Sequence, residues 1–587
     1  MSRMVETLRH EDFYETGTRI DESLGVYVGW TARKKSFSDG MPLRNEQGDV
    51  DLVFSGEEYP EPGVVGGLRQ RGHSLDSEGL SYLVHLYEED PSFPKGLNGM
   101  FHGLAINRTR GTATLFNDRF GMHRLYYHES EEGFYFAAEA KAILAVRSGL
   151  RTADPRGLGE FVSLGCVLEN RTMFPGVRVL PGASAWVFRA GSLEKRGTYF
   201  EPREWEEQDA LDPESYYREL RNVLSRNLPR YFAGREPIGV ALTGGLDTRV
   251  LMAWQKHLPR TLPCYTFGGT FRDCQDVVMA RRVANLCRQS HEVITVGDEF
   301  LKRFPYYAER SVYLTEGGVD VYRSSDLYVS ERARQIAPVK LVGTYGSEIV
   351  RHDVMFKPAS PLSGLFSPEF DSYAAQARAT YAQVRLQHPV TFAAFRQSPW
   401  YHHGILSLEQ TQLTVRSPYL DNDFVRTVFR APQGSDRSAD VRLRLIGDGD
   451  PALGRIRSDR GLGGRSGISS AMARRLLEFT FKAEYAYDYG MPHWLAKIDS
   501  TLAPLHLERL FLGRHKFSHY RLWYRNGLAE YVRQILLDPR TLSRPYLERK
   551  AVEATVKGHL AGDRNYTTQI HKLLTLELLQ RLFIDSK

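Results

Sequence analysis

The chain has 587 residues, of which 42% are hydrophobic and 25% are charged, values close to the average for soluble globular proteins. This composition excludes a disordered, collagen-like or low-complexity chain over most of its length, and the length allows about two to four domains. The 77 Lys and Arg residues exceed the 71 Asp and Glu residues by six. That surplus is too small to require a nucleic acid or an acidic membrane as partner.

The cysteines and the first residues carry no metal or targeting signal. The four cysteines, which form no CxxC pair and no His-supplemented metal spacing, are Cys166, Cys264, Cys274 and Cys287. No apolar run approaches the roughly 20 residues needed to cross a bilayer. The start, MSRMVETLRHEDF, has charges where a signal peptide needs its apolar segment. We therefore expect reduced thiols, a cytoplasmic enzyme and no membrane partner.

The first 200 residues are typical of a strand-rich domain. Short apolar or alternating runs, separated by Gly and turn pairs, occur at 26–30, 51–54, 100–106 and 134–139. After about residue 200 the composition becomes acidic, and a segment that begins like an amphipathic helix follows, capped by Asp212 before Pro213. We place a domain boundary here, which gives domains at 1–205 and 206–587.

The second part alternates buried strands with helices. The apolar strand candidates are IGVAL at 238–242, CYTF at 264–267 and EVITV at 292–296, with helices expected from about 248 and around 275–287. This alternation predicts a parallel sheet flanked by helices. After about 365 the pattern becomes almost wholly helical. The stretch 446–467 is rich in Gly, Arg and Asp and lacks helical periodicity, so we expect a sizeable exposed loop there.

One strand-to-helix turn has the composition of an anion site. The strand at 238–242 runs directly into Thr243-Gly244-Gly245-Leu246-Asp247-Thr248 and then into a helical pattern. Two adjacent glycines let backbone N–H groups approach a ligand, while the helix directs its positive end to the same spot. The two threonine hydroxyls can donate to phosphate oxygens, and Asp247 is placed to hold a magnesium ion. A tight turn without a ligand is the alternative.

Several segments carry a family resemblance. TGGLDT resembles the pyrophosphate-binding loop Ser-Gly-Gly-x-Asp-Ser of the ATP pyrophosphatases, with threonine at both serine positions. RSPYLDNDF at 416–424 is similar to the Arg-x-Pro-Phe-Leu-Asp signature of asparagine synthetases. The segments LNGMFHGLAI and NDRFGMHRLYY within 97–127, and FAAEAKAIL at 136–144, resemble motifs of that family's N-terminal domain. By these motifs the chain is identified as a divergent member of the asparagine synthetase family.

The resemblance implies an α/β and α+β protein with two folds. The first is an Ntn-hydrolase-like β-sheet sandwich, which in the family is a glutaminase whose nucleophile is a Cys directly after the initiator Met. The second is a parallel-sheet ATP-pyrophosphatase domain, similar to the adenine nucleotide α-hydrolases, with a helical C-terminal part. The resemblance also implies ATP and Mg²⁺ as cofactors. A carboxylate would attack the α-phosphorus of ATP, pyrophosphate would leave, and an amine would then displace AMP.

The glutaminase motif is eroded in this chain. Position 2 is Ser2, no Cys precedes Cys166, and Ser55 stands where the family has an oxyanion-binding Asn. Remnants of the family's glutamine pocket are Gly56, Glu57 and Asp76. The segment 4–10 resembles a helix that follows the family's first strand, which indicates a late start and leaves open an upstream Cys. We expect an inactive glutaminase domain that acts as a scaffold.

The resemblance also implies roles for residues of the second domain. The nucleotide-binding residues would be Leu242, Thr243, Gly244, Gly245, Asp247, Thr248, Phe267 and Gly343. Asp247 and Asp276 would be the metal ligands, and Asp276 is alternatively a helix-start charge. The segment GTYGSEIVR at 343–351 stands where the family has Gly-Glu-Gly-x-Asp-Glu, so that Glu348 alone keeps its acid. Asp247 and Glu348 are therefore the expected catalytic residues, and asparagine is a doubtful product.

Other motif residues are expected to be structural or solvated. Arg416 and Asp421 are expected to form a structural pair, although a substrate role is the alternative. For Arg460, in the loop expected at 446–467, a solvated charge is favoured over a phosphate contact. The adjacent His402 and His403 lack a partner at i+4 and are expected to be ordinary polar residues.

The expected function is an ATP-dependent, amide-forming ligase acting on small-molecule carboxylate and amine substrates, without a nucleic-acid partner. The sequence leaves open a homodimer and the identity of both substrates. A genuine glutamine-hydrolysing asparagine synthetase is a second hypothesis, if an upstream start supplies the Cys. A nucleotide-binding pseudoenzyme with a regulatory role is a third, since two family acids are missing around Glu348.

Overall fold

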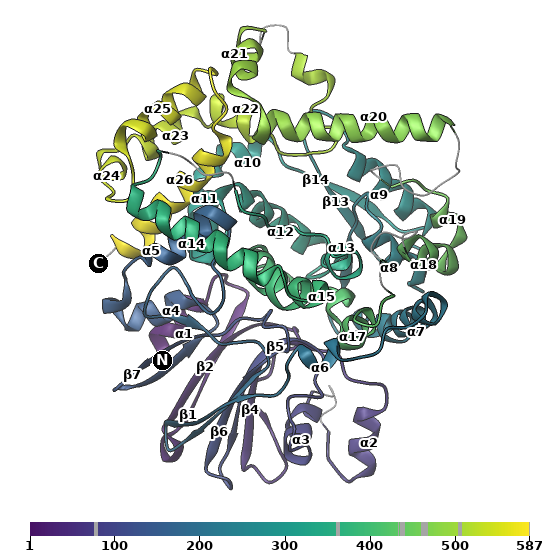
Figure 1. Cartoon of the computed structure of the whole chain (residues 1–587). Coiled ribbons are helices and arrows are strands. Elements are labelled where there is room, and N and C mark those ends of the chain that lie inside the picture. Colours follow the sequence, from purple (N-terminus) through teal and green to yellow (C-terminus); the bar gives the residue numbers. More distant parts are fainter. Residues whose placement is uncertain are drawn as a thin grey trace.

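The computed structural model describes residues 1–75, 80–359, 364–432, 434, 441–458, 468–502 and 507–585. In Figure 1 the strand-rich first part of the chain lies below the later, mostly helical part. Within the described ranges, every helix is too short or too polar to cross a membrane.

The first part is built on a six-stranded antiparallel sheet with the strand order β11-β10-β6-β5-β4-β3. Its strands are β3 (Leu43–Arg44), β4 (Val50–Glu58), β5 (Gly99–Asn107), β6 (Thr112–Asn117), β10 (Ser184–Arg189) and β11 (Ser192–Thr198). The strands expected at 51–54 and 100–106 are β4 and β5. Side chains alternate along β4, so Val53 joins one hydrophobic cluster while Leu52 and Phe54 join another. Both faces of the sheet are therefore covered.

Two smaller sheets cover one face and two helices cover the other. The smaller sheets are the hairpin of β1 (Tyr14–Asp21) and β2 (Val26–Arg33), and the order β8-β7-β9 with β7 (Tyr126–Ser130), β8 (Gly133–Ala137) and β9 (Arg178–Val179). Their apolar side chains share one cluster with the large sheet. The helices are α2 (Val64–Gln70) and α3 (Tyr82–Glu89). This arrangement confirms the expected sheet sandwich and the strands expected at 26–30 and 134–139.

The first part also contains short helices. They are α1 (Ser2–Leu8), α4 (Ala140–Val146), α5 (Pro155–Leu164) and α6 (Arg203–Glu206), with the 3-10 turns η1 (Glu22–Leu24) and η2 (Ser148–Leu150). α1 matches the helix expected at 4–10. α5 packs against α14 (Pro368–Val384) of the second part. The approach is close, because a Cβ atom on Gly159 would lie 2.6 Å from the Tyr373 Cβ.

The second part opens with α7 (Pro213–Tyr231), as predicted. Asp212 caps it by accepting hydrogen bonds from the backbone N–H groups of Glu214 and Ser215. A five-stranded, all-parallel sheet follows, with the order β14-β13-β12-β15-β16. Its strands are β12 (Ile238–Ala241), β13 (Cys264–Gly268), β14 (His291–Thr295), β15 (Val339–Leu341) and β16 (Thr414–Arg416). The parallel sheet is confirmed.

Helices surround this sheet and form the end of the chain. Those before residue 360 are α8 (Asp247–Trp254), α9 (Gln275–Leu286), α10 (Asp298–Lys302), α11 (Phe304–Thr315), η3 (Val321–Arg323), α12 (Ser324–Ile336) and α13 (Gly346–Arg351). Those between 364 and 502, besides α14, are α15 (Pro389–Phe392), η4 (Ala393–His402), α16 (His403–Gln410), η5 (Pro418–Leu420), α17 (Asn422–Val428), α18 (Val441–Gly449), α19 (Pro451–Gly454), α20 (Ile468–Tyr485), η7 (Ala486–Gly490) and α21 (His493–Leu502). The remainder are η9 (Leu507–Leu510), α22 (Tyr520–Arg525), α23 (Ala529–Leu536), α24 (Pro539–Leu542), α25 (Arg549–Leu560), α26 (Thr567–Leu579) and η10 (Gln580–Ile584).

The described stretch after 365 is almost wholly helical, as expected, with the three-residue strand β16 at the sheet edge beside β15. The expectation for 446–467 was wrong in part. The segment 446–467 is not one exposed loop. Its first residues belong to α18 and α19, with Ile446 and Leu453 buried, and Asp450 caps α19 ahead of Pro451. Residues 459–467, which include Arg460, lie outside the described residues.

A buried ion pair joins the two parts of the chain. Arg416, at the end of β16, donates from Nε and Nη2 to the two carboxylate oxygens of Glu57 on β4, at 2.7 and 2.6 Å. Both side chains are less than a tenth exposed. Asp421 accepts from the side-chain amides of Asn98 and Asn227, each at 2.8 Å. The sequence analysis expected Arg416 and Asp421 to pair with each other. In the structure they do not, and each stabilises the junction through other partners.

We predict that Glu57→Gln destabilises the protein, because it leaves the buried Arg416 guanidinium without a counter-charge. Removing one partner of a buried pair costs about 3–5 kcal/mol. Thermal unfolding followed by circular dichroism measures the change. The control is Glu207→Gln, which removes one partner of the exposed Arg203–Glu207 pair and is expected to change the melting temperature little. Equal melting temperatures for the two variants would contradict the claim that the buried Glu57–Arg416 pair stabilises the protein.

Candidate functional site

The predicted anion loop lies where the parallel sheet reverses its winding. β12 and β15 are neighbours, but the chain proceeds from β12 to β13 on one side and from β15 to β16 on the other. The turn at 242–246 after β12 and the turn at 342–345 after β15 therefore meet at the carboxyl ends of adjacent strands. In open parallel sheets such a switch point is where ligands bind.

The loop itself presents both accessible and engaged groups. Thr243 is exposed and Gly245 is half-buried, whereas Thr248 is buried at the start of α8. The Gly245 N–H donates to Thr243 Oγ1 at 3.3 Å, and the two threonine Oγ1 atoms lie 3.4 Å apart. An ordinary phosphate loop needs accessible N–H and hydroxyl groups beside a helix N-terminus. Thr243 offers an exposed hydroxyl here, and the Gly245 N–H could bind a phosphate only by exchanging its hydrogen bond to Thr243.

Two glycines after β15 permit the close approach of the second turn. A Cβ atom on Gly343 would lie 2.5 Å from the Thr248 backbone nitrogen, and one on Gly346 would lie 2.7 Å from the Asp247 Cγ atom. Both separations are too short for any larger residue. Between them, Tyr345 adopts a φ of 75°, which is strained for an aromatic residue. The two turns thus form one tightly packed unit around Asp247.

Asp247 is held from three directions. One carboxylate oxygen accepts from Arg442 on α18, and the other accepts from the Ser347 hydroxyl at 2.8 Å. Arg442 also donates to Ser347 Oγ at 2.7 Å. The Tyr419 hydroxyl donates to the Asp247 backbone oxygen at 2.8 Å. Burial raises the pKa of the Asp247 carboxyl above its usual value, while Arg442 and Ser347 act in the opposite direction.

Glu348 lies in the same turn but contacts a different group. It is in the first turn of α13 and is 6% exposed. One of its carboxylate oxygens lies 3.2 Å from Nε2 of His402, at the end of η4. The negative charge of Glu348 contributes to the raised pKa of Asp247, so the two carboxylates interact. Glu348 and His402 form a buried acid–imidazole pair beside the loop.

The other expected residues are distributed around this centre. Asp276, in the first turn of α9, accepts the Gly244 N–H at 2.7 Å. Leu242 is buried, and its backbone oxygen accepts from the Thr266 hydroxyl at 3.0 Å. Phe267 at the end of β13 is partly buried, and its ring lies 6.0 Å from that of Phe517. Asp276 thus joins the loop, but the described contacts do not join it to Asp247.

The sequence analysis did not identify three residues that contact Asp247 or Glu348. Arg442 and Tyr419 reach Asp247 from segments about 195 and 172 residues away, and His402 reaches Glu348 from η4. The expectation that His402 is an ordinary polar residue overlooked this contact. No local spacing signals such partners, because each is brought in by the packing of a separate helix.

Two residues expected in a glutamine pocket, Ser55 and Glu57, contact other side chains of the protein. The Ser55 hydroxyl is hydrogen-bonded to His123 Nε2 at 3.0 Å, and burial lowers the pKa of His123 well below its ordinary value. Glu57 is held by Arg416. Ser55 and Glu57 line a cavity of about 190 Å³ that lies between the first and second parts of the chain. Asp76 lies outside the described residues.

Two family models match the chain. The glutamine amidotransferase domain matches residues 34–200, and asparagine synthase matches residues 219–442. The chain belongs to the asparagine synthetase family. It is similar to "Asparagine synthetase [glutamine-hydrolyzing] 1" of Bacillus subtilis, with 24% identity over 44% of this chain and 41% of the relative. It is also similar to a putative asparagine synthetase [glutamine-hydrolyzing] of Mycobacterium bovis, with 27% identity over 70% of this chain and 64% of the relative.

Asparagine synthetase B [glutamine-hydrolyzing] of Escherichia coli shares 22% identity over 51% of each chain. The chain thus spans about two fifths to just under two thirds of the length of these curated relatives. A solved structure of an allosteric regulatory enzyme of purine biosynthesis covers 44% of this chain at 11% identity, with a TM-score of 0.22, which is too low to bear on the fold.

We predict that Arg442→Gln destabilises the protein increasingly as pH rises. A carboxyl whose pKa is raised by folding favours the folded state most at pH values below its unfolded pKa, and this contribution is lost as pH rises through the folded pKa. Because Arg442 lowers the pKa of Asp247, its loss raises that pKa further and enlarges the cost of ionised Asp247. The melting temperature relative to the unaltered protein should fall progressively above about pH 4.

The matched control is Arg444→Gln on the same helix. Arg444 is half-exposed and pairs with Glu214, which is 63% exposed, so screening by water keeps the pair weak. Arg444→Gln should change the melting temperature only slightly relative to the unaltered protein, and this change should vary little between about pH 4.5 and pH 8. A flat profile for Arg442→Gln would show that Asp247 does not depend on that guanidinium.

Proposed function

We propose that the protein is an ATP-dependent, amide-forming ligase that adenylates a carboxylate and transfers an amine to it. Two domains, 1–205 and 206–587, would divide a scaffold role from this chemistry. The proposal is supported above all by the loop 243–248 at the switch point of the sheet, with the turn at 343–346 packed against Asp247. Membership of the asparagine synthetase family supports the same reaction class.

The loop residues would bind and orient the triphosphate of ATP. The Thr243 hydroxyl is exposed, the Gly245 N–H would exchange its bond to Thr243 for one to a phosphate oxygen, and the N-terminus of α8 would direct its positive end toward the phosphates. The substrate carboxylate oxygen forms a bond to the α-phosphorus, and the bond to the departing pyrophosphate breaks. Donors fixed in advance around the phosphates stabilise the charge that develops on that leaving group. AMP then leaves as the amine forms the amide.

Asp247 fits a magnesium ion only in competition with Arg442. Mg²⁺ prefers carboxylate and other oxygen ligands, and Asp247 lies beside the hydroxyl of Ser347. Both of its carboxylate oxygens are, however, engaged by Arg442 and Ser347. When bound, Mg²⁺ supplies charge that neutralises the phosphates. Arg442, once released from Asp247, would itself lie beside those phosphates. The role of Asp276 as a second metal ligand is a further part of this proposal.

Glu348 is proposed as the proton acceptor for the attacking amine. An amine that forms an amide must lose a proton, and a positioned carboxylate can take it. Glu348 is buried near Asp247, and the imidazole of His402 lies 3.2 Å from it. This contact would help to fix the position of the Glu348 carboxylate. Thr344 and Ser347, which replace two family acids, make a substrate other than aspartate the favoured one.

A second candidate is a nucleotide-binding regulator without catalysis. The full engagement of the Asp247 carboxylate by Arg442 and Ser347 favours it. The two candidates differ in one observable, which is whether bound ATP exchanges its pyrophosphate in the presence of an acid.

We predict magnesium-dependent exchange of labelled pyrophosphate into ATP when a suitable carboxylic acid is present. A panel of carboxylic acids that includes L-aspartate tests this. Asp247→Asn should lower the exchange rate at least about a hundredfold, the effect typical of losing one preorganised electrostatic contact. The control Asp298→Asn changes an exposed carboxylate at the start of α10 and should leave the rate unchanged. ATP binding without exchange for any acid would favour the regulator instead.

We also predict that glutamine is not the nitrogen donor of this chain. The pocket residue Glu57 is held by Arg416, and Ser55 is hydrogen-bonded to His123. Incubation with glutamine, ATP and the active acid should release glutamate only at the background rate, whereas ammonium chloride or another amine should support amide formation. Glutamate release equal to ATP consumption would revive the glutamine-hydrolysing hypothesis.

A further inference from the structure

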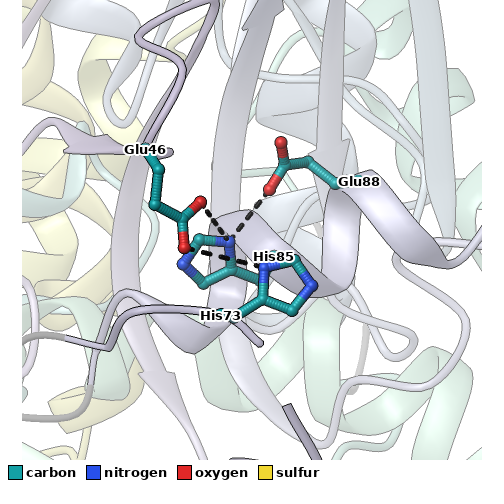
Figure 2. A group of neighbouring side chains, drawn as sticks. All are labelled: Glu46, His73, His85 and Glu88. Atoms are coloured by element: carbon teal, nitrogen blue, oxygen red, sulfur yellow. Dashed lines mark hydrogen bonds and ion pairs between the residues drawn. The ribbon is translucent and has the colours of Figure 1, made fainter. Parts of the chain in front are cut away.

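Four side chains that can ligate a metal converge on one edge of the N-terminal sandwich, away from the loop at 243–248. Glu46 lies in the turn between β3 and β4, and His73 follows α2. His85 and Glu88 lie three residues apart on α3 and therefore share one helix face. Figure 2 shows the four side chains pointing toward one another. The proposed ligase chemistry uses none of them.

The separations between their ligand atoms are close to those of a zinc site. One ligand atom from each residue lies within 4.8 Å of every other. Nδ1 of His85 is 2.9 Å from a Glu88 oxygen and 3.6 Å from a Glu46 oxygen, and Nδ1 of His73 is 3.7 Å from Glu46. Four atoms placed about 2.0–2.1 Å from a tetrahedral zinc ion are about 3.3 Å apart. Small side-chain rotations would bring the group to that geometry.

Surrounding groups already orient the ligands. Nε2 of His73 is 2.8 Å from a Glu89 oxygen, and Arg71 holds Glu89 at 2.8 Å. This contact leaves Nδ1 of His73 facing Glu46. A carboxylate that fixes the outer nitrogen of an imidazole is the usual support of a metal-binding histidine. The Asn45 amide donates to Glu88, and the Ser74 N–H donates to Glu46, so both carboxylates are also oriented.

The charge balance favours a divalent cation. Three carboxylates, those of Glu46, Glu88 and Glu89, meet here, and among the described ion pairs only Arg71 brings a permanent positive charge to them. The imidazole of His85 is 1% exposed, and its Nε2 has no hydrogen-bond partner in the described part of the chain. A bound cation would offset this excess of carboxylate charge.

We propose that Glu46, His73, His85 and Glu88 form a structural zinc site. Two imidazole nitrogens and two carboxylate oxygens are a ligand set that zinc accepts, and four protein ligands leave the ion closed to substrate. Nδ1 of His85, which faces the carboxylates of Glu46 and Glu88, would be its ligand atom. The ion would link the β3–β4 turn, the segment after α2 and α3, and so stabilise the first domain.

The test uses the full chain without an affinity tag that binds metal. After incubation with ZnCl₂ and dialysis against metal-free buffer, elemental analysis should find one zinc per chain. Zinc should raise the melting temperature and a chelator should reverse the shift. Co²⁺ in place of zinc should give the visible absorption bands of a tetrahedral site, a readout that needs no variant. A chain that retains no zinc and gives no Co²⁺ bands overturns the proposal.

Variants locate the ion on the chain. His73→Gln and Glu46→Gln change partly exposed ligands and should lower zinc affinity at least about tenfold, while Glu89→Gln, which removes the outer support, should lower it about 10–100-fold. The control His128→Gln alters a partly buried imidazole of the same domain that bonds to the Gly176 oxygen and should leave zinc binding unchanged. Zinc retained equally by all variants would place it elsewhere and refute the site.

Discussion

The close approach of two turns at the centre of the parallel sheet determines what the second domain can do. Gly343 and Gly346 allow the turn after β15 to press against the loop after β12, since any Cβ there would collide with Thr248 or Asp247. The contact aligns a helix N-terminus, two hydroxyls and a carboxylate within one small space. Because the two strands are neighbours whose connections diverge, both turns lie at the carboxyl ends of the strands, where open parallel sheets bind ligands.

The electrostatics of that space set its chemistry. Burial raises the pKa of Asp247, and the hydrogen bonds from Arg442 and Ser347 act in the opposite direction by stabilising its charge. The same arrangement makes Asp247 a conditional metal ligand, because a cation must replace the guanidinium that now neutralises it. Ser347 donates a hydrogen bond to Asp247 and accepts one from Arg442, whereas an ionised acid at position 347 would repel Asp247. Ser347 and Arg442 therefore act together on the Asp247 carboxylate.

The sequence predicted the fold well and the site only in part. The apolar runs of β12, β13 and β14 and the cap at Asp212 are local signals, and each element formed where expected. β16 was missed because three residues between helices carry no periodicity. The helices α18 and α19 were missed because the glycines around Asp450 obscured the cap ahead of Pro451. Arg442, Tyr419 and His402 were beyond local inference, since only tertiary packing brings them to Asp247 and Glu348.

Glu57 links the two parts of the chain. The family resemblance implied a remnant of a glutamine pocket at this position, and in this fold both carboxylate oxygens of Glu57 accept hydrogen bonds from Arg416 at the end of β16. A buried pair of this kind is strongly unfavourable to break, so a ligand that required Glu57 would have to offset that cost before binding at all. The pair therefore fixes the junction: Glu57 on β4 holds Arg416 at the end of β16, the strand that completes the edge of the parallel sheet beside β15.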